Sequence, residues 1–282
     1  MVLLIIIIAV VIVALACLLQ GMLVTNHFRV VDEKINIKNL PQEFRGKRIL
    51  HISDLHNSRH GYKNSALAER IRELSPDYIF ASGDCMDRFS KSGDAFIELL
   101  ENLGGQFPVY YSLGNHDVVV RRDYPQRYDA FYSRICELGV TVLDNASVMI
   151  EQGDARMYLY GVSAIREKKG ETTELTVALI EQAVGKCPDD LPVLLISHEG
   201  HVFESFAGWG ADVTFCGHIH GGIVCLPILG GVFGEHGRLF PKYTRGVYEL
   251  NGKFMNLTTG LGYTKFKFRF LNMPEMSLIT LE

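Results

Sequence analysis

Polar residues that can bind a metal ion or transfer a proton follow short apolar runs at five places in the sequence. The groups are Asp54 and His56 after Ile49–Ser53, Asp84 after Tyr78–Ser82, Asn115 and His116 after Val109–Leu113, His198 after Val193–Ser197, and His218 and His220 after Val213–Cys216. Carboxylate oxygen, amide oxygen and imidazole nitrogen together suit divalent ions such as manganese, iron or zinc. The pattern therefore predicts a metal centre built at the ends of several strands.

The size of this set indicates two ions. Even seven of these eight side chains are too many for one tetrahedral ion but suffice for two ions that share a carboxylate. Paired ions about 3.5–4 Å apart clamp a phosphoryl group and activate a bridging water. The sequence contains no Gly-rich phosphate loop, no Gly-x-Ser-x-Gly motif and no Cys/His zinc-finger spacing. The favoured reaction is hydrolysis of a phosphoester or pyrophosphate bond by hydroxide that two metals activate.

The elements that position these residues alternate between apolar strands and amphipathic helices. We expect strands over residues 28–40, 48–53, 77–82, 109–113, 140–143, 147–151, 157–162, 193–197, 212–216, 246–250, 254–258 and 276–281, and helices over 65–74, 95–103, 128–138 and 175–184. This order indicates α/β layers around mixed sheets. Ligands of such sheets bind beyond the carboxyl ends of the strands, so the five groups are expected to meet at one edge.

The ordered set of motifs resembles a known superfamily. Asp54-x-His56, Gly83-Asp84, Gly114-Asn115-His116-Asp117, His198 and Gly217-His218-x-His220 together resemble the calcineurin-like metallophosphoesterases. The apolar N-terminal run, Gly221-Gly222 and Pro274-Glu275 with the final strand resemble its membrane-associated bacterial branch of YkuE/YaeI-type phosphoesterases and UDP-diacylglucosamine pyrophosphatases. The resemblance extends from Arg48 to the end of the chain.

The resemblance implies a fold and a role for each matching residue. It implies a four-layer α/β/β/α sandwich with the metal site at the carboxyl ends of the strands. The implied ligands are Asp54, His56 and His220 for the first metal and Asn115, His198 and His218 for the second, with Asp84 bridging both. His116 is implied as the catalytic imidazole, Asp87 as the residue that orients it, and Arg88 as a contact of the substrate phosphate. Glu199-Gly200 departs from relatives that carry proline nearby, which affects the loop and not the ligand.

Each motif has a simpler interpretation when it is taken alone. Asp54-x-His56 occurs by chance on solvated loops, and Gly114-Asn115-His116-Asp117 is also typical of a turn. Their joint order favours the metal centre. An alternative function on the same fold is a non-catalytic binding or scaffold protein, but the presence of every implied ligand and of His116 argues against it.

Residues outside the motifs receive more modest expectations. His51 lies within a strand and is expected to pack or to support a ligand, whereas His60, His201 and His236 lie in loops near the motifs. Asp117 is expected to support its loop. Cys85, Cys136, Cys187, Cys216 and Cys225 have no repeating spacing and are expected to be free thiols. The segment Cys225–Arg245, rich in Gly and apolar residues, is either a packed loop or a lid over the substrate.

The first residues of the chain are strongly apolar. Val2–Val24 contains no charged residue, which predicts a transmembrane helix. The run is too long for a signal peptide and lacks a basic start, so an uncleaved anchor is expected. Arg29, Lys34 and Lys38 follow it and favour a single-pass membrane protein with a cytoplasmic catalytic domain.

These observations divide the chain and limit its partners. We expect a transmembrane anchor over residues 1–25, a linker with the first strand over 26–47, and a metallophosphoesterase domain over 48–282. The net charge of −4 gives no basic footprint for nucleic acid. The expected partner is a phosphoester substrate, with a lipid-linked one favoured because of the predicted anchor and a soluble nucleotide or phosphoprotein left open. The sequence does not indicate an oligomeric state.

Overall fold

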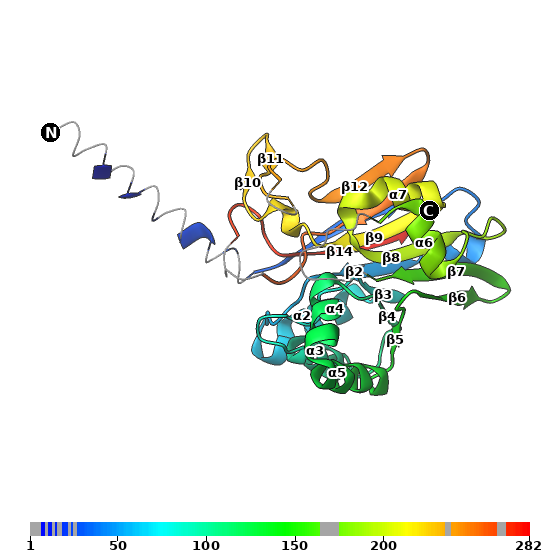
Figure 1. The fold of residues 1–282 in the computed structure, drawn as a ribbon, viewed down its shortest axis with the longest axis horizontal. Helices are drawn as coiled ribbons and strands as arrows, with labels where there is room; N and C mark the ends of the chain where they lie inside the picture. The colour runs from blue at the N-terminus through cyan, green and yellow to red at the C-terminus, as the bar shows by residue number, and fades with distance from the viewer. Residues whose placement is uncertain are drawn as a thin grey trace.

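Two six-stranded sheets stacked face to face form the centre of the molecule (Figure 1). The computed structural model describes residues 7–8, 11–12, 15, 19–21, 24, 27–163, 175–234, 238–263 and 269–282. The first sheet has, in spatial order, β1 (Arg29–Ile35), β14 (Glu275–Leu281), β2 (Arg48–Ile52), β3 (Tyr78–Ala81), β4 (Val109–Tyr111) and β5 (Val140–Val142). Strands β2 to β5 are parallel, and β14 is antiparallel to β2.

The second sheet repeats this plan with antiparallel strands at both edges. Its order is β12 (Gly246–Leu250), β13 (Lys253–Leu257), β9 (Val213–Gly217), β8 (Val193–Glu199), β7 (Ala155–Val162) and β6 (Ala146–Gln152). Strands β13, β9, β8 and β7 are parallel. A short hairpin of β10 (Cys225–Leu226) and β11 (Gly230–Gly231) follows β9.

Helices cover the outer face of each sheet. The helices on the side of the first sheet are α2 (Ser65–Leu74), α3 (Asp94–Leu103), α4 (Asn115–Asp123) and α5 (Pro125–Glu137), and those on the second are α6 (Val177–Val184) and α7 (Phe203–Trp209). In α2 the side chains of Leu67, Ile71 and Leu74 lie on one face and are buried against the first sheet. Single turns of 3₁₀ helix occur at Gln42–Phe44, Tyr62–Asn64, Gly200–Val202 and His220–Gly222.

Three buried clusters hold these layers together. One lies between the first sheet and its helices and includes Leu50, Phe96 and Phe131. Another lies between the two sheets and includes Ile49 and Phe215, and a third packs α7 on the second sheet. The chain therefore has a mixed α/β fold in which the strands that precede the polar motifs are fixed from both faces.

Most predicted elements are confirmed within a few residues, but α4, α7 and the β10–β11 hairpin were not predicted. The motif Gly114-Asn115-His116-Asp117 resembles a turn in sequence, and it begins a helix in the structure. The next helix begins at Pro125, three residues before the predicted start, because proline is well suited to the first helical turn.

The predicted membrane anchor is corrected by the structure. Among the helices of the described residues, none combines the length and the apolar character that crossing a bilayer requires. Even α5, with 13 residues, is shorter than the roughly 20 residues that a membrane span needs. This finding overturns the predictions of a transmembrane helix over residues 1–25, of membrane attachment through it, and of a single-pass location with a cytoplasmic domain. Those predictions rested on the hydropathy of the first residues and on the basic residues that follow them, and most of residues 1–26 lie outside the described part.

Candidate metal centre

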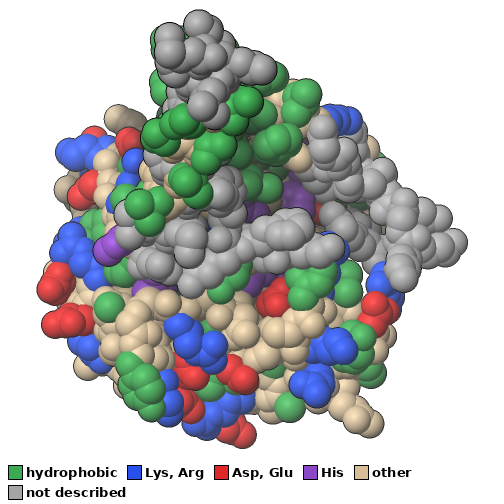
Figure 2. Space-filling model, turned by 90° about the vertical axis from the view of Figure 1, so that its left-hand side faces the viewer, with side chains coloured by type: hydrophobic (Ala, Val, Ile, Leu, Met, Phe, Trp, Pro, Cys, Tyr) green, Lys and Arg blue, Asp and Glu red, His purple; other side chains and the backbone are tan. Residues whose placement is uncertain are grey.

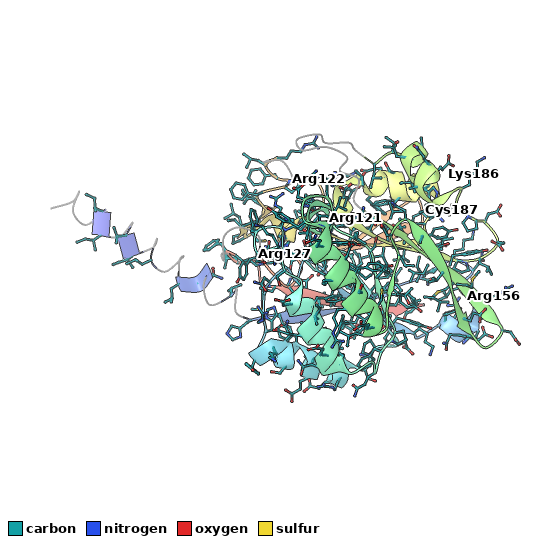
Figure 3. The ribbon with its side chains drawn as sticks, turned by 60° about the horizontal axis from the view of Figure 1, so that its bottom comes forward. Arg121, Arg122, Arg127, Arg156, Lys186 and Cys187 are labelled. Atoms are coloured by element: carbon teal, nitrogen blue, oxygen red, sulfur yellow. The ribbon has the colours of Figure 1, made fainter. Side chains whose placement is uncertain are left out.

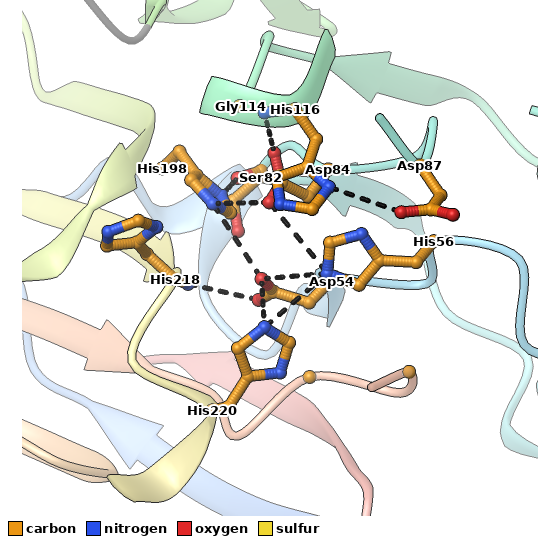
Figure 4. A network of polar contacts seen from close by, with 12 residues as sticks. Asp54, His56, Ser82, Asp84, Asp87, Gly114, His116, His198, His218 and His220 are labelled. Atoms are coloured by element: carbon orange, nitrogen blue, oxygen red, sulfur yellow. Dashed lines mark hydrogen bonds and ion pairs between the residues drawn. The ribbon is translucent and has the colours of Figure 1, made fainter. Parts of the chain in front are cut away.

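The five sequence motifs meet at one edge of the two sheets, at the carboxyl ends of β2, β3, β4, β8 and β9 (Figure 4). The first group consists of Asp54, His56 and His220, whose ligand atoms all lie within 4.8 Å of one another. The Nε2 atom of His220 lies 3.3 Å from Oδ1 of Asp54 and 3.4 Å from Nε2 of His56. These are the three residues that the resemblance assigns to the first metal.

A second group shares the same centre. Asp84, His198 and His218 bring one ligand atom each within 4.8 Å of the others. The Nε2 atom of His198 lies 3.2 Å from Oδ2 of Asp84 and 3.7 Å from Oδ1 of Asp54, so His198 lies between the two carboxylates. Asn115 is buried at the start of α4, next to His116.

Asp84 lies between the two groups. Its Oδ2 atom is 3.8 Å from Nε2 of His56, which belongs to the first group, and 3.2 Å from Nε2 of His198, which belongs to the second. Its other oxygen accepts a hydrogen bond of 2.7 Å from the backbone N–H of His116. This position is the one expected of a carboxylate that bridges two ions.

His116 forms a third group with His56 and Asp84, in which the ligand atoms lie within 4.8 Å of one another, and Asp87 lies beside it. The rings of His116 and His56 have centroids 4.5 Å apart, and Nδ1 of His116 lies 3.5 Å from Oδ1 of Asp87. The backbone N–H of Arg88 lies 3.3 Å from the same Nδ1 atom. The Arg88 guanidinium stacks over the ring of Phe89, 4.9 Å from the ring centroid. Arg88 therefore contacts His116 through its backbone and not through its side chain.

The backbone at this edge has an unusual conformation. Asp54, His56, Asp84, His218 and His220 all have positive φ angles, between 48° and 76°. Such conformations cost of order 1–3 kcal/mol each for residues other than glycine and persist where the surrounding structure imposes them. Their concentration in five of the predicted ligands is independent support for a functional site.

The charges of the site favour a cation. Burial raises the pKa of Asp54, but nearby His220 and His198 outweigh it and lower the pKa to about 2. Burial likewise opposes the ionisation of Asp84, but His198 and His116 hold its pKa well below the usual value. Burial lowers the pKa of His56 to about 4 and that of His220 to about 3. Ionised carboxylates and the neutral imidazoles of His56 and His220 are the ligand forms that divalent metals require. Burial lowers the pKa of His198, but Asp84 and Asp54 outweigh it and raise the pKa to about 10, so this ring must release its proton when a metal binds.

Unpartnered atoms test whether this site fits a metal. Oδ1 of Asp54 and Oδ1 of Asn115 are buried without a hydrogen-bond donor, and Nε2 of His198 also lacks a hydrogen bond. Buried polar atoms are costly unless they are bonded to another group. Two nitrogen ligands about 2.1 Å from one tetrahedral ion lie roughly 3.4 Å apart, as the Nε2 atoms of His56 and His220 do. The donor set therefore fits divalent metal.

Loops at the strand ends are held together by Asp117. Its Oδ2 atom accepts hydrogen bonds of 2.7 Å from the backbone N–H groups of both Asp84 and Gly114, and its Oδ1 atom accepts one from Met86. A Cβ atom at Gly114 would lie 2.3 Å from Oδ1 of Asp84, so only glycine fits there. The predicted supporting role of Asp117 agrees with these contacts.

Sequence reasoning missed the loop after β13 and Arg269. A Cβ atom at Gly260 would lie 2.6 Å from Cβ of Asp54, which shows how closely this loop approaches the site. Arg269 is 1% exposed, donates to the carbonyl oxygens of Thr259 and Gly262, and has Nη2 3.2 Å from Nδ1 of His220. The glycines after strand 254–258 could have indicated a loop that approaches the site closely. No sequence pattern near Arg269 indicated that this residue contacts the site.

The remaining histidines have different surroundings. His60 is 4% exposed, and its Nε2 atom lies 3.0 Å from the carbonyl oxygen of Leu261, so it packs under the loop after β13. The ring of His201 lies 6.2 Å from that of His218. His51 is fully buried in β2. The prediction for His236 lies outside the described residues.

A model of the calcineurin-like phosphoesterases matches residues 47–222, which is more than half of the chain. The chain belongs to the calcineurin-like phosphoesterase family. The protein is accordingly a metal-dependent phosphoester hydrolase, and its clustered His and Asp side chains form a site for divalent metal.

Relatives of this phosphoesterase extend over most of its length. The Bacillus subtilis metallophosphoesterase YkuE is 27% identical over 259 residues, which cover 89% of this chain and 84% of the relative. The Escherichia coli phosphodiesterase YaeI is 25% identical and covers 83% of this chain and 82% of its own. The Chlamydia trachomatis UDP-2,3-diacylglucosamine pyrophosphatase LpxG is 24% identical and covers 86% of each. The branch suggested by the sequence motifs is thus supported.

Proposed function

We propose that the phosphoesterase binds two divalent ions, one held by Asp54, His56 and His220 and the other by Asn115, His198 and His218, with Asp84 shared. The observation that carries this proposal is the position of Asp84 Oδ2, 3.8 Å from the first group and 3.2 Å from the second. Manganese, iron and zinc all suit this mixture of oxygen and nitrogen ligands. When bound, such a pair supplies an activated water and neutralises charge on the phosphoryl group.

His116 is the proposed proton donor to the leaving oxygen. Its ring lies at the edge of the metal groups, and Asp87 lies beside Nδ1 at 3.5 Å. Asp87 is held ionised beside this ring: burial raises its pKa, but hydrogen bonds from His116 and Ser90 outweigh burial and lower the pKa below its usual value. Proton transfer to a leaving group by a positioned imidazole contributes typically 10²–10⁴-fold to the rate.

Arg88 is the proposed contact of the substrate phosphate. It follows Asp87 directly, is partly exposed, and stacks on Phe89 at the margin of the site. Arg88→Ala should raise KM with little change in kcat. Arg156→Ala is the matched control, since Arg156 lies at the amino end of β7, far from the strand ends that carry the site (Figure 3).

The proposed substrate subclass is a lipid-linked phosphoester or pyrophosphate. The β10–β11 hairpin that follows His220-Gly221-Gly222 exposes Ile228 at 106% and Leu229 at 63%, and Phe240, further along the chain, is 52% exposed. On the face shown in Figure 2, hydrophobic side chains gather beside histidine side chains. Apolar side chains next to a phosphate site suit an acyl chain. The name of the relative LpxG, a pyrophosphatase of a diacylated nucleotide sugar, agrees with this subclass.

A pair of substrates tests the lipid preference. The full-length protein is assayed with UDP-2,3-diacylglucosamine and with UDP-N-acetylglucosamine, which lacks the long acyl chains. We expect the acylated substrate to be preferred at least about tenfold in kcat/KM, since each buried CH₂ contributes roughly 0.8 kcal/mol. Leu229→Ser should reduce that ratio, whereas Tyr132→Ser, at an exposed position of α5, should not. A wide preference for the soluble nucleotide would refute the lipid-linked subclass.

A further inference from the structure

A layer of polar side chains lies between the two sheets, directly below the metal centre. Further from the site, the side chains between the sheets are apolar. They include Ile49 on β2, Phe80 on β3 and Phe254 on β13. Two residues further along each strand the same face carries His51, Ser82 and Asn256. All three polar side chains are at most 1% exposed. The inter-sheet core thus becomes polar just before the strands end.

His51 connects the two sheets through this layer. Its Nδ1 atom lies 2.6 Å from Oδ1 of Asn256 in the second sheet, and its Nε2 atom lies 2.7 Å from Oγ of Ser82 in the first. An amide oxygen only accepts, so Nδ1 carries the hydrogen and Nε2 accepts from the Ser82 hydroxyl. Burial also lowers the pKa of His51 to about 4, which keeps the ring neutral near pH 7. One tautomer of His51 therefore satisfies both partners.

Ser82 passes this constraint to a metal ligand. The carbonyl oxygen of Ser82 lies 2.7 Å from Nδ1 of His198 and accepts its hydrogen (Figure 4). That leaves Nε2 as the nitrogen that faces Asp84 and Asp54 and, once it has released its proton, as the ligand atom. Groups that accept the second N–H of a ligating histidine fix its tautomer and its ring orientation. Ser82 also leads directly into the Gly83-Asp84 turn, so the same residue supports both partners of the 3.2 Å contact.

We propose that Asn256, His51 and Ser82 form a positioning relay that holds His198 in its ligand orientation and so sets the affinity of the ion bound there. The relay rests on the proposed role of His198 as a ligand. None of these three side chains forms a hydrogen bond or an ion pair with the carboxylates of Asp54 or Asp84. They therefore act through His198 and through the strand ends. Holding the Ser82 side chain at Oγ restricts rotation of the peptide group that accepts from His198.

Binding of Mn²⁺ to the metal-free full-length chain, measured by isothermal titration calorimetry, tests the relay. Ser82→Ala removes only the hydroxyl, and one of the two Mn²⁺ ions should bind about 10- to 100-fold more weakly. His51→Leu should weaken Mn²⁺ binding to the same extent. The double variant of Ser82→Ala and His51→Leu should bind Mn²⁺ no more weakly than either single variant, because each substitution breaks the same chain of contacts. His51→Gln keeps an acceptor for Ser82 and should restore binding to within a few fold of wild type.

Two further variants make the test decisive. Thr214→Val is the matched control, because Thr214 is fully buried in β9 and its Oγ1 atom makes no hydrogen bond within the described part of the chain. This variant should bind Mn²⁺ as tightly as the wild type. His198→Ala should lose one ion. If His198→Ala still binds two ions, the ligand assignment fails. If it loses one while Ser82→Ala binds both ions normally, the relay alone is refuted. Should His51→Leu not fold, Ser82→Ala decides.

Discussion

The Nδ1 atom of His116 lies 3.5 Å from Oδ1 of Asp87, although the two residues come from the ends of different strands of the first sheet. Asp87 and the backbone N–H of Arg88 both lie at Nδ1, so Nε2 is the ring nitrogen that we propose as the proton donor. His116→Ala should lower kcat by about 10²–10⁴-fold while both ions stay bound. Metal analysis of the purified variant beside its kinetics checks this, and loss of an ion would identify His116 as a ligand instead.

The leaving group distinguishes proton donation by His116 from a role in binding. An alkyl phosphoester, whose leaving oxygen needs a proton, should lose far more rate in His116→Ala than a p-nitrophenyl ester, whose leaving group departs as an anion. Asp87→Asn should show the same preference more weakly. Equal losses for both esters would contradict the assignment of His116 as a general acid.

Replacement of Asp84 should abolish most of the stabilisation that bound metal gives to the folded protein. Ligand that binds only the folded state stabilises it by about 2.7 kcal/mol at a hundredfold excess over Kd. We therefore expect Mn²⁺ to raise the Tm of the wild-type protein, and Asp84→Ala to lose most of that increase because Asp84 contacts both groups. Thermal unfolding with Mn²⁺ and with EDTA measures both. An unchanged Mn²⁺ effect in Asp84→Ala would show that Asp84 holds neither ion.

Arg269 should contribute strongly to stability as well as to the site. Its guanidinium is buried and donates to the carbonyl oxygens of Thr259, Gly260 and Gly262. Arg269→Met leaves the carbonyl oxygens of Thr259 and Gly262 without this donor, whereas that of Gly260 still accepts from the backbone N–H of Glu275. Each acceptor that stays buried without a donor costs about 1–3 kcal/mol, so urea unfolding should give a loss of at least about 2 kcal/mol. Arg127→Met, at an exposed position of α5, serves as the control and should change stability by less than about 0.5 kcal/mol. A similar small change in Arg269→Met would contradict the role.

His51 makes stability depend on pH in a defined direction. The unfolded chain takes up a proton near pH 6.5, whereas burial lowers the pKa of the folded ring to about 4, with Asp54 and His198 acting in opposite directions. The unfolded state thus binds more protons between these values, so stability is full above pH 6.5 and falls as the pH drops towards 4. From pH 7 to pH 5 in EDTA, the wild type should lose roughly 2 kcal/mol more than His51→Gln. Equal losses in urea unfolding would contradict this.

The sequence predicted the strands and the ligands for the same reason. Buried parallel strands are apolar runs, and five of the runs in this chain lead into the proposed ligands, so the sequence alone indicated that residues such as His198 and Asp84 lie at strand ends. Periodicity also located α2 to the residue. These features depend on local pattern, which a single sequence carries in full.

Long-range features could not be predicted in this way. Helix α4 begins within Gly114-Asn115-His116-Asp117 because Asp117 accepts from backbone groups of another loop, and no local pattern reveals that partner. Arg269 reaches His220 across 49 residues of sequence. The apolar N-terminal run shows the opposite error, because hydropathy alone predicted a membrane helix that the described residues do not contain.

The central claim is that two ions at one site carry out the hydrolysis, and a stoichiometric titration tests it most directly. Metal-free full-length protein at a concentration far above Kd is titrated with Mn²⁺, and hydrolysis of bis-p-nitrophenyl phosphate is followed at each step. We expect activity to level off at two equivalents of Mn²⁺ per chain and to be absent at every step in Asp84→Ala. A plateau at one equivalent, or full activity without metal, would contradict the two-ion centre.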